Sequence, residues 1–253
     1  MEINHTAVII TGGASGMGAA TAKRLSHLGA KVSLLDLNTT AAEQIAKEIN
    51  GVAIACDVTQ AESVEKALAL AIEKHGVPRI CINCAGVVHA RRMVNQQGPM
   101  PLADFQKIIN INLIGTFNVM RLVAEAMIPL PALQDHERGI IINTASVAAF
   151  EGQIGQTAYS ASKGGIVSLT LPAARELAQF GIRVMAIAPG LVDTPMFGQL
   201  SPEAKTALEM NVPFPKRLAK PDEYAALVQH IIENVMLNGE VIRLDGALRM
   251  QAK

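Results

Sequence analysis

The chain contains no tryptophan, and aromatic side chains make up only 3% of its 253 residues. Half of the residues are nevertheless hydrophobic, so the apolar mass is aliphatic and suits helices packed on buried parallel strands. Net charge is also lacking, because 22 basic residues balance 22 acidic ones. Without a basic surface the chain has no general attraction for long polyanions, and we expect no nucleic-acid partner.

Long apolar runs and cysteines are equally scarce. No run approaches the roughly 18 residues of a membrane span, and the segment before residue 7 lacks the arginines of an organelle leader. We therefore expect no membrane partner and a cytoplasmic location. The cysteines, Cys56, Cys81 and Cys84, are an odd number, which argues against a disulfide framework. Cys81 and Cys84 have redox-motif spacing but end a predicted buried strand, and we interpret them as packing residues.

Short apolar runs alternate with helical patterns along the whole chain. This alternation predicts a doubly wound α/β fold of the Rossmann type, with a seven-stranded parallel sheet flanked by helices. No linker interrupts it, and residues 1–253 are expected to form a single domain. We expect strands at 7–11, 31–36, 52–56, 79–83, 139–143, 183–188 and 240–244. We expect helices at 17–28, 40–49, 61–74, 102–127, 157–180 and 221–233, the third opened by a capping-box pattern at Thr59 and Glu62.

Two stretches, about 87–101 and 191–221, escape the alternation. Loops of this length are uncommon in a compact domain and often act as lids or binding segments. Both follow predicted strands, so both should emerge at the carboxyl edge of the sheet, where open α/β folds bind ligands. We expect them to form the substrate side of the protein, although solvated surface excursions remain the alternative.

A glycine-rich turn, Gly12, Gly13, Gly16 and Gly18, connects the first predicted strand to the first helix. Glycine lets a backbone turn tightly and approach a pyrophosphate, whose charge is favoured by free N–H groups at a helix start. The spacing differs from the standard Gly-x-Gly-x-x-Gly fingerprint. Its position between a strand and a helix still predicts a dinucleotide site.

Asp36 ends the second predicted strand. A carboxylate there can accept hydrogen bonds from an adenosine ribose and would repel a 2′-phosphate, which favours NAD over NADP. Ser15 and Leu37 offer no cation for such a phosphate. A capping role is the alternative for Asp36, and Asp57 could likewise cap the following turn or face an adenine edge.

Tyr159 and Lys163 lie one helical turn apart, with Ser146 upstream after the fifth predicted strand. Residues four apart on a helix are neighbours, so the Lys163 ammonium can act on the Tyr159 phenol. A phenol with an ordinary pKa near 10 is a poor base at neutral pH, and a nearby cation favours phenolate. Each residue alone also has a plain structural interpretation as packing, cap or surface.

Together with Asn112 and the segment Asn83-Cys-Ala-Gly86, these motifs resemble the short-chain dehydrogenase/reductase family over essentially the whole chain. Cys84 stands where the family usually has asparagine. The resemblance implies that Tyr159 is the general acid/base and that Ser146 holds the substrate oxygen. It also implies that Lys163 binds ribose and lowers the tyrosine pKa, and that Asn112 holds a water linking Lys163 to solvent.

The resemblance completes the expected cofactor site and implies no metal. Pro189, Gly190 and Thr194 match the family segment that holds the nicotinamide end. The residues expected to contact NAD are Gly12, Ser15, Gly16, Met17, Gly18, Asp36, Leu37, Asp57, Val58, Asn83, Ala85, Gly86, Tyr159, Lys163, Pro189, Gly190, Val192 and Thr194.

Segments around 141–152, 159–167, 212–215 and 237–246 resemble the 3-hydroxyacyl-CoA dehydrogenase subgroup of the family. That resemblance implies oxidation of (S)-3-hydroxyacyl-CoA, including 2-methyl-3-hydroxybutyryl-CoA, to 3-ketoacyl-CoA with NAD, possible action on hydroxysteroids, and a homotetramer. The alternatives are a dehydrogenase of other secondary alcohols, a 3-ketoacyl reductase, and a nucleotide-binding scaffold or regulator.

Two hypotheses concern the substrate. The pair Arg91-Arg92, or the pair Lys216-Arg217, contacts CoA phosphates, because these are the cations of the two long loops. Gln153 and Gln156 lie between Ser146 and Tyr159 and line the acyl pocket together with them. Ordinary solvated charge and a solvent-facing turn are the respective alternatives.

Overall fold

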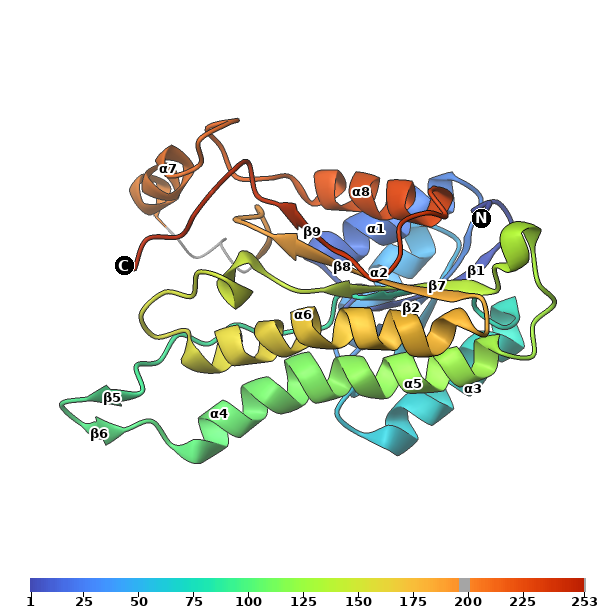
Figure 1. Ribbon diagram of the computed structural model, residues 1–253, viewed down its shortest axis with the longest axis horizontal. Coiled ribbons are helices and arrows are strands. Elements are labelled where there is room, and N and C mark those ends of the chain that lie inside the picture. The colour runs from blue at the N-terminus through green and yellow to red at the C-terminus, as the bar shows by residue number, and fades with distance from the viewer. Residues whose placement is uncertain (196–200, 253) are drawn as a thin grey trace.

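The computed structural model describes residues 1–195 and 201–252. The strands of its main sheet are β1 (Ala7–Thr11), β2 (Lys31–Asp36), β3 (Val52–Ala55), β4 (Ile80–Asn83), β7 (Gly139–Thr144), β8 (Ile182–Pro189) and β9 (Val241–Leu244). They lie in the order β3-β2-β1-β4-β7-β8-β9, and every neighbouring pair is parallel (Figure 1). The predicted seven-stranded parallel sheet is confirmed. The order reverses between β1 and β4, and such reversals are where open parallel sheets bind ligands.

Helices cover both faces of the sheet (Figure 1). Their bounds are α1 (Gly16–His27), α2 (Thr39–Glu48), α3 (Ala61–His75), α4 (Leu102–Ile109), α5 (Gly115–Met127), α6 (Thr157–Ala178), α7 (Pro202–Met210) and α8 (Pro221–Glu233). Short 3-10 turns occur at Gln134–His136 and Val147–Ala149. Most predicted bounds agree to within one or two residues.

Two apolar cores follow from this layering. One core packs α1, α2 and α8 on the sheet and includes Leu25, Ala42 and Val228. The other packs α3, α5 and α6 on the opposite face and includes Val64, Val119 and Ala174. Both are built mainly from aliphatic side chains, and the first also contains the ring of Tyr224. The inner strands are buried on both faces, and every residue of β1, β4, β7 and β8 is buried.

The predicted helix at 102–127 is not regular. Residues Asn110–Ile114 form a π-helical segment between α4 and α5. Such segments are rare, occur inside α-helices, and are often found at functional sites. The apolar periodicity of 102–127 could not reveal this segment because the axis continues through it. Its buried member is Asn112, one of the predicted site residues.

The two long excursions lie at one end of the molecule (Figure 1). The first, 87–101, contains the antiparallel hairpin of β5 (Val94–Asn95) and β6 (Gly98–Pro99). The second, 191–221, contains α7, and residues 196–200 of it lie outside the described residues. A bridge between Val192 and Ala219 joins the two ends of this second excursion. No helix in the described ranges has the length and apolar character of a membrane span.

Candidate active site

The turn between β1 and α1 is closed so tightly that side chains are excluded from it. Gly12 has φ +65°, and a Cβ added to it would lie 2.7 Å from the backbone nitrogen of Ala85. A Cβ on Gly18 would lie 2.2 Å from the Gly12 carbonyl oxygen. The Gly12 N–H donates to the Leu35 carbonyl at 2.9 Å. The turn therefore presents backbone to whatever occupies the space in front of α1.

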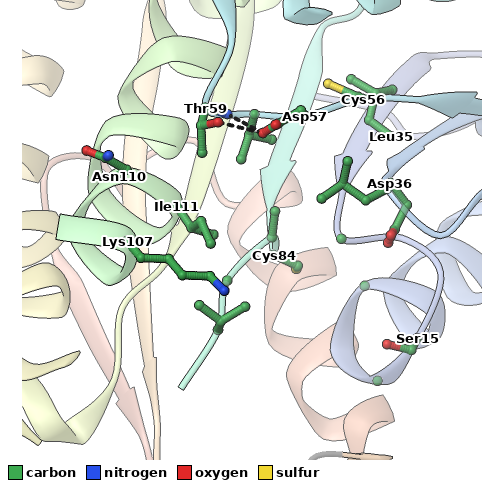
Figure 2. Close-up of a pocket in the computed structure, with 18 of the residues that line it drawn as sticks. Ser15, Leu35, Asp36, Cys56, Asp57, Thr59, Cys84, Lys107, Asn110 and Ile111 are labelled. Atoms are coloured by element: carbon green, nitrogen blue, oxygen red, sulfur yellow. Dashed lines mark hydrogen bonds between the residues drawn. The ribbon is translucent and has the colours of Figure 1, made fainter. Parts of the chain in front are cut away.

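That space is a cavity of about 710 Å³ at the carboxyl edge of β1, β2, β3 and β4. Figure 2 shows how side chains from the strand ends and from the α4–π segment surround it. Among the residues described as lining it, the charged ones are Asp36, Asp57 and Lys107. The predicted cofactor residues that line it are Gly12, Ser15, Gly16, Met17, Gly18, Asp36, Leu37, Asp57, Val58, Ala85, Gly86 and Thr194.

Asp36 links the glycine turn to the start of α2 through its two carboxylate oxygens. Its Oδ2 accepts from the Ala14 N–H at 3.0 Å, and its Oδ1 accepts from the Asn38 N–H at 2.9 Å. The cap of α2 is supplied by Asn38, whose side chain accepts from the Ala41 N–H. Each Asp36 oxygen keeps further acceptor capacity toward the cavity. The carboxylate can thus shape the turn and still accept hydrogen bonds from a ribose.

Asp57 forms the turn after β3. Its Oδ1 accepts from both the N–H and the hydroxyl of Thr59, at 2.9 and 2.7 Å (Figure 2). The predicted capping box at Thr59 is therefore wrong. Gln60, not Thr59, is the N-cap of α3 and makes no side-chain cap bond, while the Thr59 hydroxyl donates to Asp57. Asp57 forms the turn and lines the cavity at the same time.

Ser146, Tyr159 and Lys163 come together beyond the end of β7. The Lys163 ammonium donates to the Thr144 carbonyl at 2.7 Å and lies 5.8 Å from the centre of the Tyr159 ring. Ser146 caps the turn Val147–Ala149 by accepting from the Ala148 N–H. Ser146 also lies close enough to the Tyr159 phenol to lower the pKa of that phenol. The serine hydroxyl and the phenol therefore face the same point.

Burial controls the electrostatics of this group. It lowers the pKa of Lys163 to about 8 and raises the pKa of the Tyr159 phenol, while Ser146 opposes the rise at Tyr159. The net shift at Tyr159 is upward. The lowering of the tyrosine pKa by Lys163 stays a prediction for the loaded site, where charge and solvent differ.

Asn112 is fully buried and fixes the irregular segment after β4. Its Oδ1 accepts from the Val87 N–H at 2.8 Å, and its Nδ2 donates to the Val87 carbonyl at 2.9 Å and to the Ser162 hydroxyl at 3.0 Å. Gly86 lies beside it, because a Cβ there would be 3.2 Å from Asn112 Oδ1 and 3.6 Å from Lys163 Nζ. The segment 85–87 therefore lines the cavity and, at Gly86, lies beside Lys163. The water held by Asn112 stays a prediction.

Asn83 faces neighbouring strands. Its Nδ2 donates to Asn143 Oδ1 at 2.9 Å, and its Oδ1 accepts from the Thr11 hydroxyl at 3.3 Å. It does not line the cavity described above. Its side chain ties β4 to β1 and β7, and thereby sets where the segment 85–87 begins.

The remaining predicted residues fall into two places. Thr194 lines the cavity against Gly16, whereas Pro189, Gly190 and Val192 lie on the path that leads to it from β8. Gln153 Nε2 donates to the Gln251 carbonyl, and Gln156 Oε1 accepts from the Gln153 N–H. Both glutamine amides are thus engaged within their own loop and the C-terminal tail.

The sequence reasoning missed one wall of the cavity. Ala103, Gln106, Lys107, Asn110 and Ile111 line it from the α4–π segment. Figure 2 shows the Lys107 side chain directed toward the strand end at Cys84. The spacing of three and four residues was the available signal, since such residues share a helix face. Recognising it required knowing that this helix lies beside segment 85–87.

An open cavity beside a turn that excludes side chains, with a carboxylate at its rim, fits a dinucleotide, and the adjoining serine, tyrosine and lysine can move a proton. Residues 6–205 match the family model described as short chain dehydrogenase, and the chain belongs to that family. It is an oxidoreductase that uses a nicotinamide cofactor.

The similarity extends over the full chain. A protein of Bos taurus named 3-hydroxyacyl-CoA dehydrogenase type-2 is 57% identical over 99% of this chain and 97% of its own length. The crystal structure of 3-hydroxyacyl-CoA dehydrogenase type-2 from Mycobacterium avium has a TM-score of 0.95 at 40% identity, covering 98% of both chains. A 3-ketoacyl-(acyl-carrier-protein) reductase from Brucella melitensis, complexed with NADH, has a TM-score of 0.86 at 28% identity, covering 98% of this chain and 100% of its own. The predicted family and fold are confirmed.

Proposed function

We propose that this protein oxidises (S)-3-hydroxyacyl-CoA thioesters, including 2-methyl-3-hydroxybutyryl-CoA, to 3-ketoacyl-CoA with NAD. The observation that carries the reaction is the convergence of Ser146, Tyr159 and Lys163 beside the cavity. The substrate is supported by full-length similarity to a relative of that name.

The chain's own residues handle the proton. The Lys163 ammonium favours the phenolate form of Tyr159, and the phenolate accepts the proton of the substrate alcohol while Ser146 donates a hydrogen bond to the substrate oxygen. The Thr144 carbonyl fixes that ammonium at 2.7 Å. A nicotinamide cofactor held by the glycine turn, Asp36 and segment 85–87 supplies the hydride acceptor.

The rim of the cavity supports NAD over NADP. Asp36 is the charged group at the end of β2, and the neighbouring Leu37 is largely exposed and apolar. A 2′-phosphate would approach a carboxylate with no cation beside it on that strand end. Lys107 belongs to a different wall, on the α4 side.

Of the four cations proposed to contact CoA phosphates, two are already held in ion pairs. Arg91 forms an ion pair with Asp104, and Arg217 forms a bidentate pair with Glu223. Arg92 and Lys216 are exposed and make no ion pair within the described part of the chain. We therefore assign phosphate contact to Arg92 and Lys216, one from each long loop.

This assignment is tested with R92Q/K216Q beside R91Q as the matched control. The double variant should raise KM for acyl-CoA by about tenfold, the order expected when charged hydrogen bonds are lost. Its KM for a short free hydroxy acid should stay within about twofold. Equal effects on both substrates, or an equal effect of R91Q, would remove the assignment.

The proposed reaction is tested by following NADH formation with purified protein. The panel contains straight and branched 3-hydroxyacyl-CoA, hydroxysteroids, secondary alcohols and a 3-hydroxyacyl group on carrier protein. We expect the highest kcat/KM for 3-hydroxyacyl-CoA. A ranking that places acyl-CoA last would contradict the proposal.

A 3-ketoacyl reductase is the second candidate, supported by the fold shared with the Brucella protein. Preference for NADPH and a carrier-bound substrate in the same panel would favour it.

The proposed homotetramer is supported by apolar side chains that are exposed on α5 and its neighbours, namely Ile114, Phe117 and Leu171, and sedimentation velocity measures the oligomeric state. The cytoplasmic location and a scaffold role stay predictions.

A further inference from the structure

A buried hydroxyl network lies behind Lys163. Tyr224, on α8, is 0% exposed, and its hydroxyl lies 2.8 Å from Thr144 Oγ1 and 3.6 Å from Cys84 Sγ. Thr144 ends β7 and supplies the carbonyl that binds the Lys163 ammonium. Thr144 thus links Tyr224 to the ammonium that lies beside the Tyr159 ring.

The direction of each bond follows from counting hydrogens. Thr144 Oγ1 lies 2.6 Å from the Asn83 carbonyl oxygen, which can only accept, so the threonine hydroxyl donates its single hydrogen there. Tyr224 must then be the donor to Thr144, and the Cys84 thiol the donor to Tyr224. The shared hydrogens run from Cys84 through Tyr224 and Thr144 to the backbone of β4.

This chain of donors fixes the residue that positions the catalytic group. The Thr144 side chain is held from α8 by Tyr224 and from β4 by Asn83, which leaves its carbonyl directed at Lys163. Ser146 follows only two residues later on the same strand end. Cys84, where the family usually has asparagine, completes the network from the cavity side.

We propose that Tyr224 is a positioning residue, which acts through Thr144 to hold the Lys163 ammonium and the Ser146 segment in the geometry for proton transfer. The positioning role rests on the proposed reaction, but the hydrogen-bond network exists in the protein without cofactor or substrate. The network can therefore be tested independently of the substrate.

The first measurement is the kinetics of Y224F and T144V. Phenylalanine keeps the buried ring and removes only the donor, so we expect folding to persist and kcat to fall about tenfold. KM for the alcohol should change by less than about twofold. T144S keeps the hydroxyl and should retain most of the activity that T144V loses.

A double-mutant cycle separates a connected network from two unrelated defects. If Tyr224 acts through the Thr144 hydroxyl, Y224F/T144V should lose no more activity than T144V alone. Losses that multiply would overturn the proposal. T170V is the matched control, because Thr170 is equally buried on α6 but its hydroxyl donates to the carbonyl of Ile166 in its own helix.

The second measurement is competitive amine labelling of Lys163, read by mass spectrometry without cofactor. The titratable groups facing Lys163 are the Cys84 thiol and the Tyr159 phenol. A less firmly held Thr144 carbonyl stabilises the Lys163 ammonium less, so a larger fraction of Lys163 is the free amine that the reagent labels. Labelling at pH 7 should therefore rise roughly three- to tenfold in Y224F and T144V. It should not rise in T144S or T170V.

The outcomes distinguish this proposal from the proposed function. A failure of wild-type turnover on acyl-CoA contradicts the substrate but leaves the labelling result valid. Unchanged labelling and unchanged kcat in Y224F would overturn the role of Tyr224. A lowered melting temperature with unchanged labelling would assign Tyr224 to packing alone, and would overturn it too.

Discussion

The cofactor side and the substrate side of this protein are built by different means. On the cofactor side, backbone meets backbone so closely that a Cβ on Gly12 or Gly18 would overlap main-chain atoms. On the substrate side, ion pairs hold the loops, with Arg91 on Asp104, Arg217 on Glu223 and Arg243 on Glu151. The first arrangement is contact between backbone atoms that leaves no room for a Cβ, whereas the second is pairing between partly exposed charged side chains. We expect the first to tolerate almost no change and the second to tolerate single losses.

The C-terminal tail extends this contrast. Glu151, between Ser146 and Tyr159, accepts a bidentate bond from Arg243, and the Ile154 N–H donates to the Ala252 carbonyl. The tail therefore holds the loop that separates the two catalytic residues. No periodic pattern in the sequence announces such contacts.

The largest effect is expected where the two sides meet. Y159F removes the proton acceptor, and kcat should fall about 10²- to 10⁴-fold, the usual contribution of general acid-base catalysis. The Kd for NADH, measured by fluorescence, should change little. Turnover near that of wild type would show that Tyr159 is not the proton acceptor and that the reaction does not depend on the serine, tyrosine and lysine beside the cavity.

The next effect tests the rigidity of the cofactor side. G18A places a Cβ 2.2 Å from the Gly12 carbonyl oxygen, so we expect a loss of stability of about 1–3 kcal/mol or more and loss of NADH binding. Urea unfolding and NADH titration measure both. G164A is the control, because a Cβ there meets nothing within 4 Å and a helical alanine is favourable. Normal NADH binding by G18A would contradict the comparison.

A smaller effect concerns cofactor choice. D36N keeps the shape but removes the charge that disfavours a 2′-phosphate, so the preference for NAD over NADP in kcat/KM should fall by roughly tenfold. D36N should also weaken NAD binding through the glycine turn, because the asparagine amide has a single oxygen and cannot replace both carboxylate oxygens that accept from Ala14 and Asn38. An unchanged preference would show that Asp36 does not set the choice between NAD and NADP, and Lys107 would be the next residue to substitute.

The smallest effect is expected on the substrate side. The Arg217 hydrogen bonds lower the pKa of the Glu223 carboxyl to about 2. A lowered carboxyl pKa stabilises the fold above the unfolded value near 4.3, and this contribution is lost as pH falls toward 2. The pair is well exposed, so E223Q should cost less than about 1 kcal/mol at pH 7 and nothing near pH 2. A larger cost, or a cost that grows on acidification, would show that this loop is as rigid as the glycine turn.

The sequence predicted most of what lies on strands. Alternating apolar runs located all seven strands of the main sheet, because buried parallel strands read as short aliphatic runs. The glycine turn and Asp36 were found for a similar reason, since their roles are carried by residue type and position. The sequence missed the π-helical segment at Asn110–Ile114, because apolar periodicity does not register one wider turn.

The residues that the sequence misjudged are those whose side chains are already paired with a neighbouring group in the fold. Thr59 was predicted to cap a helix, but its hydroxyl donates to Asp57 instead. Arg91 and Arg217 looked like free cations until Asp104 and Glu223 were found beside them. Each error arose because a side chain's function depends on which groups satisfy it, and distance in space decides that.

By itself, the sequence determined the doubly wound sheet, which follows from the alternation of apolar runs and helical patterns. Its motifs also carried the resemblance to the family, and that resemblance identified the serine, tyrosine and lysine. Only the tertiary structure placed Tyr224 behind Thr144, Asn112 against Val87 and Lys107 in the cavity wall. These contacts join elements separated by tens of residues, and they exist only once the sheet and its two helical layers have packed.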